Sequence, residues 1–288
     1  MQVERIEFAG EDGITLVADA WGDPANPPVI LAHGGGQTRH SWGGTAQVLA
    51  EQGWYAVAYD HRGHGESDWS PDSLYDIVHF ALDMACLARR FSTPPVVVGA
   101  SLGGMSAMLG AGEIEAGMFS AIVLVDVTPR LNQAGVMKIF EFMHEHIESG
   151  FGSLEEAADA VSKYTGRPRR ADLSGLRKNL RERDGRYYWH WDPNFFAPRQ
   201  NGPGAPERLL DAAVKIKLPV LLIRGRSSDV VTELEVEEFL QLIPHAETVD
   251  VDQARHMVAG DRNDIFTAAV TGFLRKLRAA PALNEEGE

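Results

Sequence analysis

The chain has 288 residues, of which 44% are hydrophobic and 24% charged, values that are ordinary for a folded globular protein of one or two domains. Its 27 basic and 41 acidic residues give a net charge of −14 without an offsetting basic stripe, which argues against nucleic acid or an anionic membrane as a partner. The single cysteine, Cys86, excludes an intramolecular disulfide and lies in an apolar helical pattern, so we expect it in the core. Because there is no apolar signal region and no apolar run of 18 residues, we expect a cytoplasmic protein.

Strands and helices are predicted to alternate along most of the chain. Residues 3–8 and 14–20 alternate apolar and polar side chains around Asp12-Gly13, which predicts an antiparallel hairpin. Later apolar runs without alternation are typical of strands buried on both faces of a parallel sheet, and they cover residues 28–32, 55–59, 96–100, 121–125 and 220–223. A last strand is expected over 247–251, and helical patterns cover 41–52, 73–91, 102–111 and a closing stripe from Phe266 to Leu277. These elements predict an α/β fold with a mostly parallel sheet of eight strands flanked by helices.

The alternation breaks between residues 128 and 215. This stretch shows several helical segments and no convincing strand, and it is too long for a plain loop. We therefore predict a helical cap over 128–215, inserted into a core of residues 1–127 and 216–279. Residues 280–288 are expected to form a disordered tail.

A pentapeptide between a predicted strand and a predicted helix carries the main functional signal. It is the G-x-S-x-G sequence that runs from Gly99 to Gly103. A sharp strand-to-helix turn strains the central residue, and side chains two positions before and after it would collide, so glycine fits there. In this context the pattern predicts that Ser101 is an exposed nucleophile.

A serine nucleophile needs a base and an orienting acid, and both should follow strands at the same edge of the sheet. His256 lies in the loop after the last predicted strand and is the expected base. Asp229 follows the strand before it and is the favoured acid. Asp126 ends another strand at the same edge and stays open as the alternative.

Backbone N–H groups should stabilise the oxyanion. One belongs to Leu102, the residue after the nucleophile. The other is expected in the loop His33-Gly34-Gly35-Gly36, where consecutive glycines let the backbone approach a substrate closely.

Taken together, these motifs resemble the α/β-hydrolase superfamily, in its serine-nucleophile esterase and non-haem-haloperoxidase-like branch with a helical cap. The resemblance extends over about residues 3–279. It implies that Ser101 is the nucleophile, His256 the base and Asp229 the acid, and it places the second oxyanion N–H on Gly35.

The resemblance also implies that the loop from Asp60 to Ser67 is mainly structural, so that His61 and His64 belong to the scaffold. Two positions depart from the usual pattern. Ser228 stands where the acid is often found, one residue before Asp229, and Arg255 replaces the glycine that often precedes the base.

These residues predict a hydrolase of carboxylic esters, lactones or thioesters that needs no cofactor or metal and forms an acyl-enzyme on Ser101. The alternatives are a carbon–carbon bond hydrolase or perhydrolase that uses the same triad, and a non-catalytic ligand-binding protein of the same fold. The expected partner is a small, largely apolar acyl substrate, and an oligomer is compatible with the sequence. The expected pocket residues are Trp42, Met105, Tyr187, Tyr188, Trp189, Trp191, Val230 and Met257.

Overall fold

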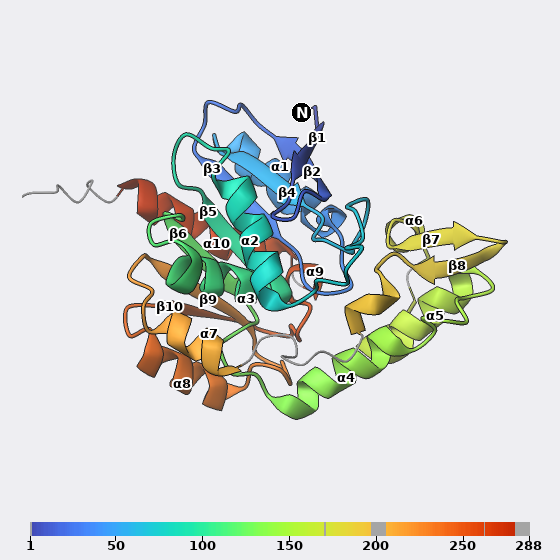
Figure 1. Cartoon of the computed structure of the whole chain (residues 1–288). Coiled ribbons are helices and arrows are strands. Elements are labelled where there is room, and N and C mark those ends of the chain that lie inside the picture. Colours follow the sequence, from blue (N-terminus) through green and yellow to red (C-terminus); the bar gives the residue numbers. More distant parts are fainter. Residues whose placement is uncertain (1, 170, 197–205, 262, 280–288) are drawn as a thin grey trace, which may run out of the picture.

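A single eight-stranded sheet forms the centre of the molecule (Figure 1). The computed structural model of the chain describes residues 2–169, 171–196, 206–261 and 263–279. In spatial order the strands are β1 (Glu4–Ala9), β2 (Thr15–Trp21), β4 (Tyr55–Tyr59), β3 (Pro28–Ala32), β5 (Val96–Ala100), β6 (Ala121–Val125), β9 (Val220–Gly225) and β10 (Glu247–Val251). β2 pairs antiparallel with β1 and β4, and all other neighbours pair in parallel. The predicted α/β fold and its mostly parallel eight-stranded sheet are confirmed.

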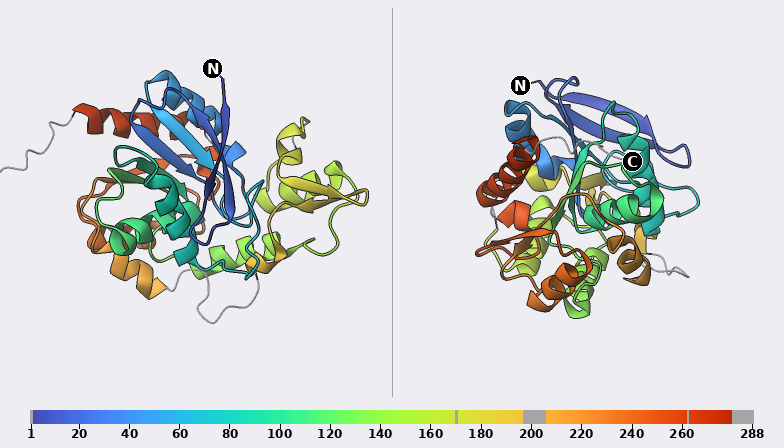
Figure 2. Two further views of the ribbon diagram at one scale, coloured as in Figure 1. Left: turned by 45° about the horizontal axis from the view of Figure 1, so that its top comes forward. Right: turned by 90° about the vertical axis from the view of Figure 1, so that its left-hand side faces the viewer.

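Helices cover both faces of the sheet, which is why the central strands are apolar without alternation (Figures 1 and 2). Within β3, Ile30 packs into one core cluster, while Val29 and Leu31 pack into the other. The cluster with Ile30 includes side chains of α2 (Ile77–Ala88), α3 (Leu102–Leu109), α7 (Pro206–Ala213) and α8 (Glu233–Leu242). The opposite cluster includes side chains of α1 (Gly43–Glu51), α9 (Val258–Asp261) and α10 (Asn263–Ala279).

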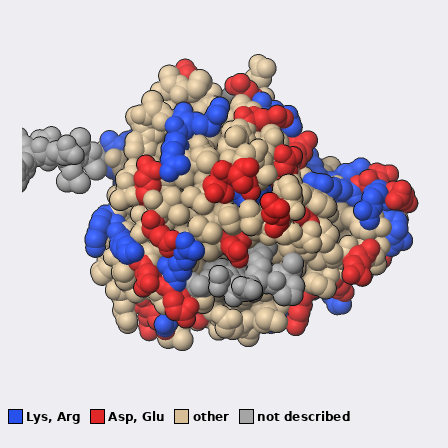
Figure 3. Space-filling view, viewed as in Figure 1, with Lys and Arg blue, Asp and Glu red and all other residues tan. Residues whose placement is uncertain are grey.

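After β6, residues 128–169 and 171–196 leave the sheet and form a projection beside the core (Figure 2). We call residues 128–196 the inserted segment. Its elements are α4 (Gln133–His144), α5 (Leu154–Thr165), α6 (Ser174–Arg177), β7 (Leu180–Arg183), β8 (Arg186–Trp189) and the short η3 (Pro193–Phe196). Figure 3 shows charged side chains of both signs crowded on this projection, at the right of the view.

The inserted segment contains a β-hairpin, so the expectation that it holds no strand is wrong. β7 and β8 pair antiparallel, with Arg183 opposite Arg186. The two residues between them, Asp184 and Gly185, both have positive φ, at 53° and 72°. An Asp-Gly turn with φ positive at both central positions matches the twist of a two-residue hairpin, and this dipeptide was the signal that the sequence offered.

Helix α7 lies near the end of the range predicted as the cap, 128–215, and it packs on the core. Leu209 and Ala212 of α7 are buried in the same cluster as α3, and α7 contacts α3 directly. The predicted tail, residues 280–288, lies outside the described residues. Within the part of the chain that the structure describes, we find no helix with the length and apolar character needed to cross a membrane.

Candidate active site

Ser101 occupies the turn between β5 and α3, with φ 46° and ψ −111°. This region of backbone space is sparsely populated for a residue other than glycine, so the turn is strained. A Cβ on Gly99 would lie 2.6 Å from the backbone of Gly103, and a Cβ on Gly103 would lie 2.4 Å from the carbonyl oxygen of Ala32. The two glycines therefore permit the close packing of strand and helix that holds Ser101 in this conformation.

His256 lies in the loop after β10 and contacts Asp126. Its Nδ1 is 2.8 Å from Oδ2 of Asp126, which is fully buried at the end of β6. The carboxylate also accepts hydrogen bonds from Gly225 N at 3.0 Å and from Ser228 Oγ at 2.6 Å. With Nδ1–H donating to the carboxylate, Nε2 of His256 is left as a proton acceptor.

Asp229, the acid favoured by sequence, lies elsewhere. One of its carboxylate oxygens is 2.8 Å from Nζ of Lys138, and its side chain is 52% exposed. Partial burial raises the pKa of Asp229, but the hydrogen bond and charge of Lys138, with smaller contributions from a backbone hydrogen bond and the charge of His256, bring the pKa below its usual value. Among the described residues, the carboxylate in hydrogen-bond contact with His256 is Asp126, and this corrects the expected contact.

The loop geometry explains the difference between the two acids. Asp126 has φ 49° and follows β6 directly, so its carboxylate stays at the edge of the sheet. Ser228 takes the position where an acid was expected, and its hydroxyl donates to Asp126 while accepting from Val230 N and Val231 N. Asp229 is one residue further along this turn and points toward α4.

The glycine loop after β3 leaves one N–H directed to no protein acceptor. Gly34 N donates to Oε1 of Gln37 at 3.1 Å, and Gly36 N donates to Nε2 of His64 at 3.1 Å. Within the described ranges, the N–H groups of Gly35 and Leu102 have no hydrogen-bond acceptor, and both residues line the same pocket as Ser101. Two free N–H groups beside a serine are what an oxyanion requires.

A pocket of about 280 Å³ contains Ser101 and His256 between the sheet edge and the inserted segment. Five of the expected pocket residues line it: Met105, Trp189, Trp191, Val230 and Met257. The other three do not, and this corrects those expectations. Trp42 is fully buried and packs against Phe266 in the core, while Tyr187 and Tyr188 lie against Arg177 and Arg183.

Sequence reasoning missed most of the wall that the inserted segment supplies. The additional apolar side chains include Val136, Ile139, Phe140, Phe142 and Met143 of α4, together with Val161, Tyr164, Leu176 and Phe195. The sequence did contain a sign of this wall, because four apolar residues of α4 are spaced so that they lie on one face of a helix: Val136, Ile139, Phe140 and Met143. A second, more polar cavity of about 520 Å³ adjoins the first, and the two share Phe142, Tyr164, Thr165, His256 and Met257.

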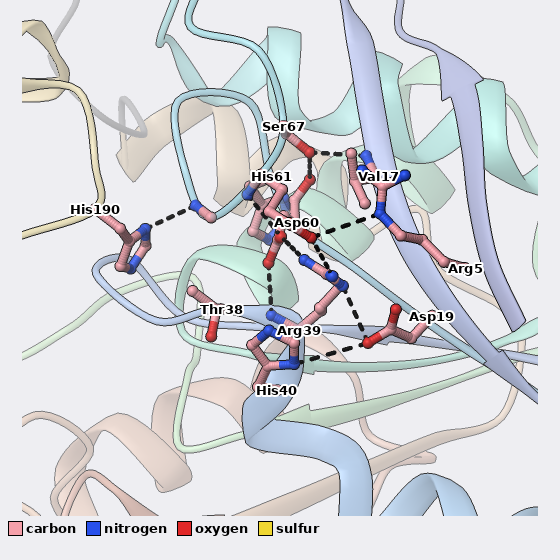
Figure 4. A network of polar contacts seen from close by, with 12 residues as sticks. Arg5, Val17, Asp19, Thr38, Arg39, His40, Asp60, His61, Ser67 and His190 are labelled. Atoms are coloured by element: carbon pink, nitrogen blue, oxygen red, sulfur yellow. Dashed lines mark hydrogen bonds and ion pairs between the residues drawn. The ribbon is translucent and has the colours of Figure 1, made fainter. Parts of the chain in front are cut away.

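The loop from Asp60 to Ser67 is a buried polar network (Figure 4). Asp60 accepts hydrogen bonds from the backbone and the guanidinium group of Arg39 and from Glu66 N at 3.0 Å. The Ser67 hydroxyl donates to the carbonyl oxygen of Asp60 at 2.7 Å. His61 is likewise fully buried, with Nε2 3.0 Å from the carbonyl oxygen of His33. These contacts fit the structural role expected for this loop.

The fold and this arrangement of side chains define an α/β-hydrolase. A sequence model of the alpha/beta hydrolase fold matches residues 27–262, and the chain belongs to this family. It is 32% identical over 289 residues to an esterase of Mycobacterium tuberculosis, Rv0045c, covering 95% of this chain and 89% of that protein. It is also 28% identical to a 3-hydroxybutyrate-oligomer hydrolase of Cupriavidus necator, covering 82% and 85%.

Solved structures of other proteins show the same fold over nearly the whole chain. A structure of the M. tuberculosis esterase superimposes with a TM-score of 0.77 at 28% identity, over 95% of this chain and 92% of that one. An alpha/beta hydrolase from Novosphingobium aromaticivorans superimposes with a TM-score of 0.78 at 25% identity, over 96% and 98%. The chain is therefore a hydrolase, and the expected resemblance is confirmed.

Proposed function

We propose that the protein is a serine hydrolase of carboxylic esters with Ser101, His256 and Asp126 as its catalytic triad. The observation that carries the proposal is the 2.8 Å contact between His256 Nδ1 and the buried Asp126, in a pocket that also contains Ser101. Relatives named as an esterase and as a 3-hydroxybutyrate-oligomer hydrolase support an ester bond as the target.

In the proposed reaction, Oγ of Ser101 attacks the ester carbonyl carbon while Nε2 of His256 takes its proton. The carbonyl oxygen becomes an oxyanion and accepts hydrogen bonds from Leu102 N–H and Gly35 N–H. His256 then protonates the leaving alcohol, and the acyl group stays on Ser101. A water molecule deprotonated by His256 attacks this ester, which releases the acid and restores the serine.

Asp126 keeps the imidazole in the required tautomer and stabilises its positive charge during both proton transfers. Ser228 and Gly225 support this role, because their hydrogen bonds hold the carboxylate oriented toward His256. In this proposal Asp229 is not part of the triad. Its contact with Lys138 instead ties the loop after β9 to α4.

The inserted segment acts in this proposal as the cap that covers the acyl group. Its aromatic and aliphatic side chains make the pocket of about 280 Å³ largely apolar, so we expect an uncharged acyl chain of moderate size. The adjoining polar cavity shares His256, the residue that protonates the leaving group. The alcohol portion of the substrate is therefore expected on that side.

Two measurements test the proposal. A fluorophosphonate probe should label the wild-type protein at Ser101, as located by peptide mass spectrometry, and p-nitrophenyl esters should be hydrolysed. The matched control is Ser101→Ala, which keeps the fold but removes the nucleophile and should lose both reactions. A folded wild-type protein that neither labels nor turns over any ester would refute the proposal. Cleavage of β-diketones without ester hydrolysis would favour the carbon–carbon alternative instead.

A further inference from the structure

Four histidines form a buried cluster behind the glycine loop. His33, His61, His64 and His190 are each no more than 2% exposed. Neighbouring rings in the cluster lie 4.5–6.4 Å apart between centroids. The proposed reaction uses none of their side chains, yet His33, His64 and His190 contact glycines of the loop that carries the Gly35 N–H.

His64 holds the nitrogen of Gly36. Its Nε2 lies 3.1 Å from Gly36 N, and its Nδ1 lies 2.9 Å from the carbonyl oxygen of Arg62. A backbone N–H can only donate and a carbonyl can only accept. His64 must therefore be neutral, with the proton on Nδ1 and a free lone pair on Nε2.

His190 contacts the carbonyl oxygen of Gly36, the same residue whose N–H is bound by His64. It follows β8 in the inserted segment, and its Nδ1 accepts from Gly65 N at 2.7 Å. Figure 4 draws this contact as a dashed line from the His190 ring. Its Nε2 faces the carbonyl oxygen of Gly36 at 3.4 Å. The same reasoning assigns the proton to Nε2, so His190 has the opposite tautomer to His64.

The two imidazoles together hold Gly36, the residue after Gly35, at its N–H and at its carbonyl oxygen. Gly36 has φ +75°, a conformation open to glycine, and a Cβ there would lie 2.8 Å from Met143. On the other side of Gly35, the Gly34 carbonyl oxygen, which shares a peptide with the Gly35 N–H, accepts from His33 Nδ1 at 2.8 Å and from Gln37 N at 3.1 Å. Gly34 N donates to the side chain of Gln37. With both flanking residues fixed, the Gly35 N–H keeps a single direction.

We propose that His64 and His190 are positioning residues, which hold Gly36 at both its N–H and its C=O and so help to keep the neighbouring Gly35 N–H directed at the oxyanion. This inference rests on the proposed serine hydrolase function. His190 also lies between Trp189 and Trp191, two pocket residues whose rings stack 4.9 Å apart. Residues 189–191 therefore connect the aromatic wall of the pocket to the glycine loop after β3.

Two substitutions of His64 separate positioning from general support of the fold. His64→Gln places an amide oxygen close to the position of Nε2, so Gly36 N keeps an acceptor. His64→Asn reaches only the position of Nδ1, so the contact with Arg62 is kept and the acceptor for Gly36 is lost. Both variants remove the aromatic ring, which makes each the control for the other.

We expect His64→Asn to lower kcat for p-nitrophenyl hexanoate by about 10-fold to 100-fold, with KM within about threefold of wild type. His64→Gln should keep kcat within about threefold. Inhibition by an aliphatic trifluoromethyl ketone, whose adduct on Ser101 carries an oxyanion, should weaken in parallel with kcat. Circular dichroism and thermal unfolding establish that each variant is folded.

Equal losses of kcat in the two variants, or no loss in folded His64→Asn, would overturn the inference. If His64→Asn does not fold, ¹⁵N NMR of the wild-type imidazoles decides instead. The expected tautomers are Nδ1–H for His64 and Nε2–H for His190, and the reverse assignment at either residue would overturn it. Failure of the proposed function has a different signature, because the wild-type protein would then neither hydrolyse the ester nor react with the fluorophosphonate.

Discussion

The buried histidine cluster predicts that the protein loses stability in mild acid. Burial lowers the pKa of His33 to about 4 and that of His64 to about 3, compared with 6.5 for an unburied imidazole. Burial also lowers the pKa values of His61 and His190 well below 6.5. Between about pH 6.5 and pH 4 the unfolded chain therefore binds more protons than the folded one, so the free energy of unfolding falls as the pH falls.

The magnitude follows from the size of the shifts. One pKa unit corresponds to about 1.4 kcal/mol, so moving from pH 6.5 to pH 5 costs about 2 kcal/mol for each histidine that stays neutral in the folded state. His33 and His64 together give a loss of about 4 kcal/mol, and His61 and His190 act in the same direction. This is a large part of the 5–15 kcal/mol that typically stabilises a folded protein.

Urea unfolding followed by circular dichroism at pH 7.5, 6.0 and 5.0 measures the effect. The control is His64→Gln, which cannot titrate in this range and should reduce the loss between pH 7.5 and pH 5.0 by about 2 kcal/mol. A free energy of unfolding that stays constant down to pH 5.0 would refute the reasoning. An equal loss in wild type and His64→Gln would show that other groups cause it.

Further substitutions test the site and the inserted segment. Asp126→Asn should lower kcat by about 10³–10⁴-fold, while Asp229→Asn should stay within about threefold, as measured with p-nitrophenyl esters; the reverse ranking would restore Asp229 as the acid. Gly99→Ala should lower kcat/KM by about 100-fold or more, because its Cβ would meet the backbone at 2.6 Å, and full activity would contradict the elbow geometry. Met143→Ala should enlarge the acyl pocket and raise the octanoate-to-butyrate ratio of kcat/KM about tenfold, whereas an unchanged ratio would place the acyl chain elsewhere. Gly185→Ala should cost about 1 kcal/mol in urea unfolding because φ is +72°, with no change in kcat.

The core was predictable because its strands are buried on both faces and read as short apolar runs. The predicted ranges 28–32, 55–59, 96–100 and 121–125 coincide with the observed β3, β4, β5 and β6. The position of Ser101 was predictable for a related reason, since glycines at fixed spacing are required wherever a strand turns sharply into a helix.

The acid was harder to predict because two carboxylates follow strands at the same edge of the sheet. Spacing along the chain could not decide between them. The outcome depends on the backbone conformation of Asp126 and on the hydroxyl of Ser228, which are tertiary features. The pocket wall was missed for a similar reason, because the helical stripe of α4 reads equally well as a helix packed into a core.

The hairpin in the inserted segment was missed because its strands lack the usual alternation. Leu180–Arg183 contains three charged residues in succession, and three of its four residues are exposed. The Asp184-Gly185 turn was therefore the main local sign of a strand pair.

The segment from Trp189 to Asp192 has a consequence for anyone who wishes to redesign substrate preference. Its odd-numbered residues, Trp189 and Trp191, line the acyl pocket. Its even-numbered residues face the core: His190 binds Gly65, while Asp192 accepts from the Tyr75 hydroxyl and donates its backbone N–H to Gly63. A mutant library that randomises 189 and 191 alone would sample new acyl specificities on an intact scaffold. In a library that also randomises 190 and 192, most variants would lose the hydrogen bonds that join the inserted segment to the core.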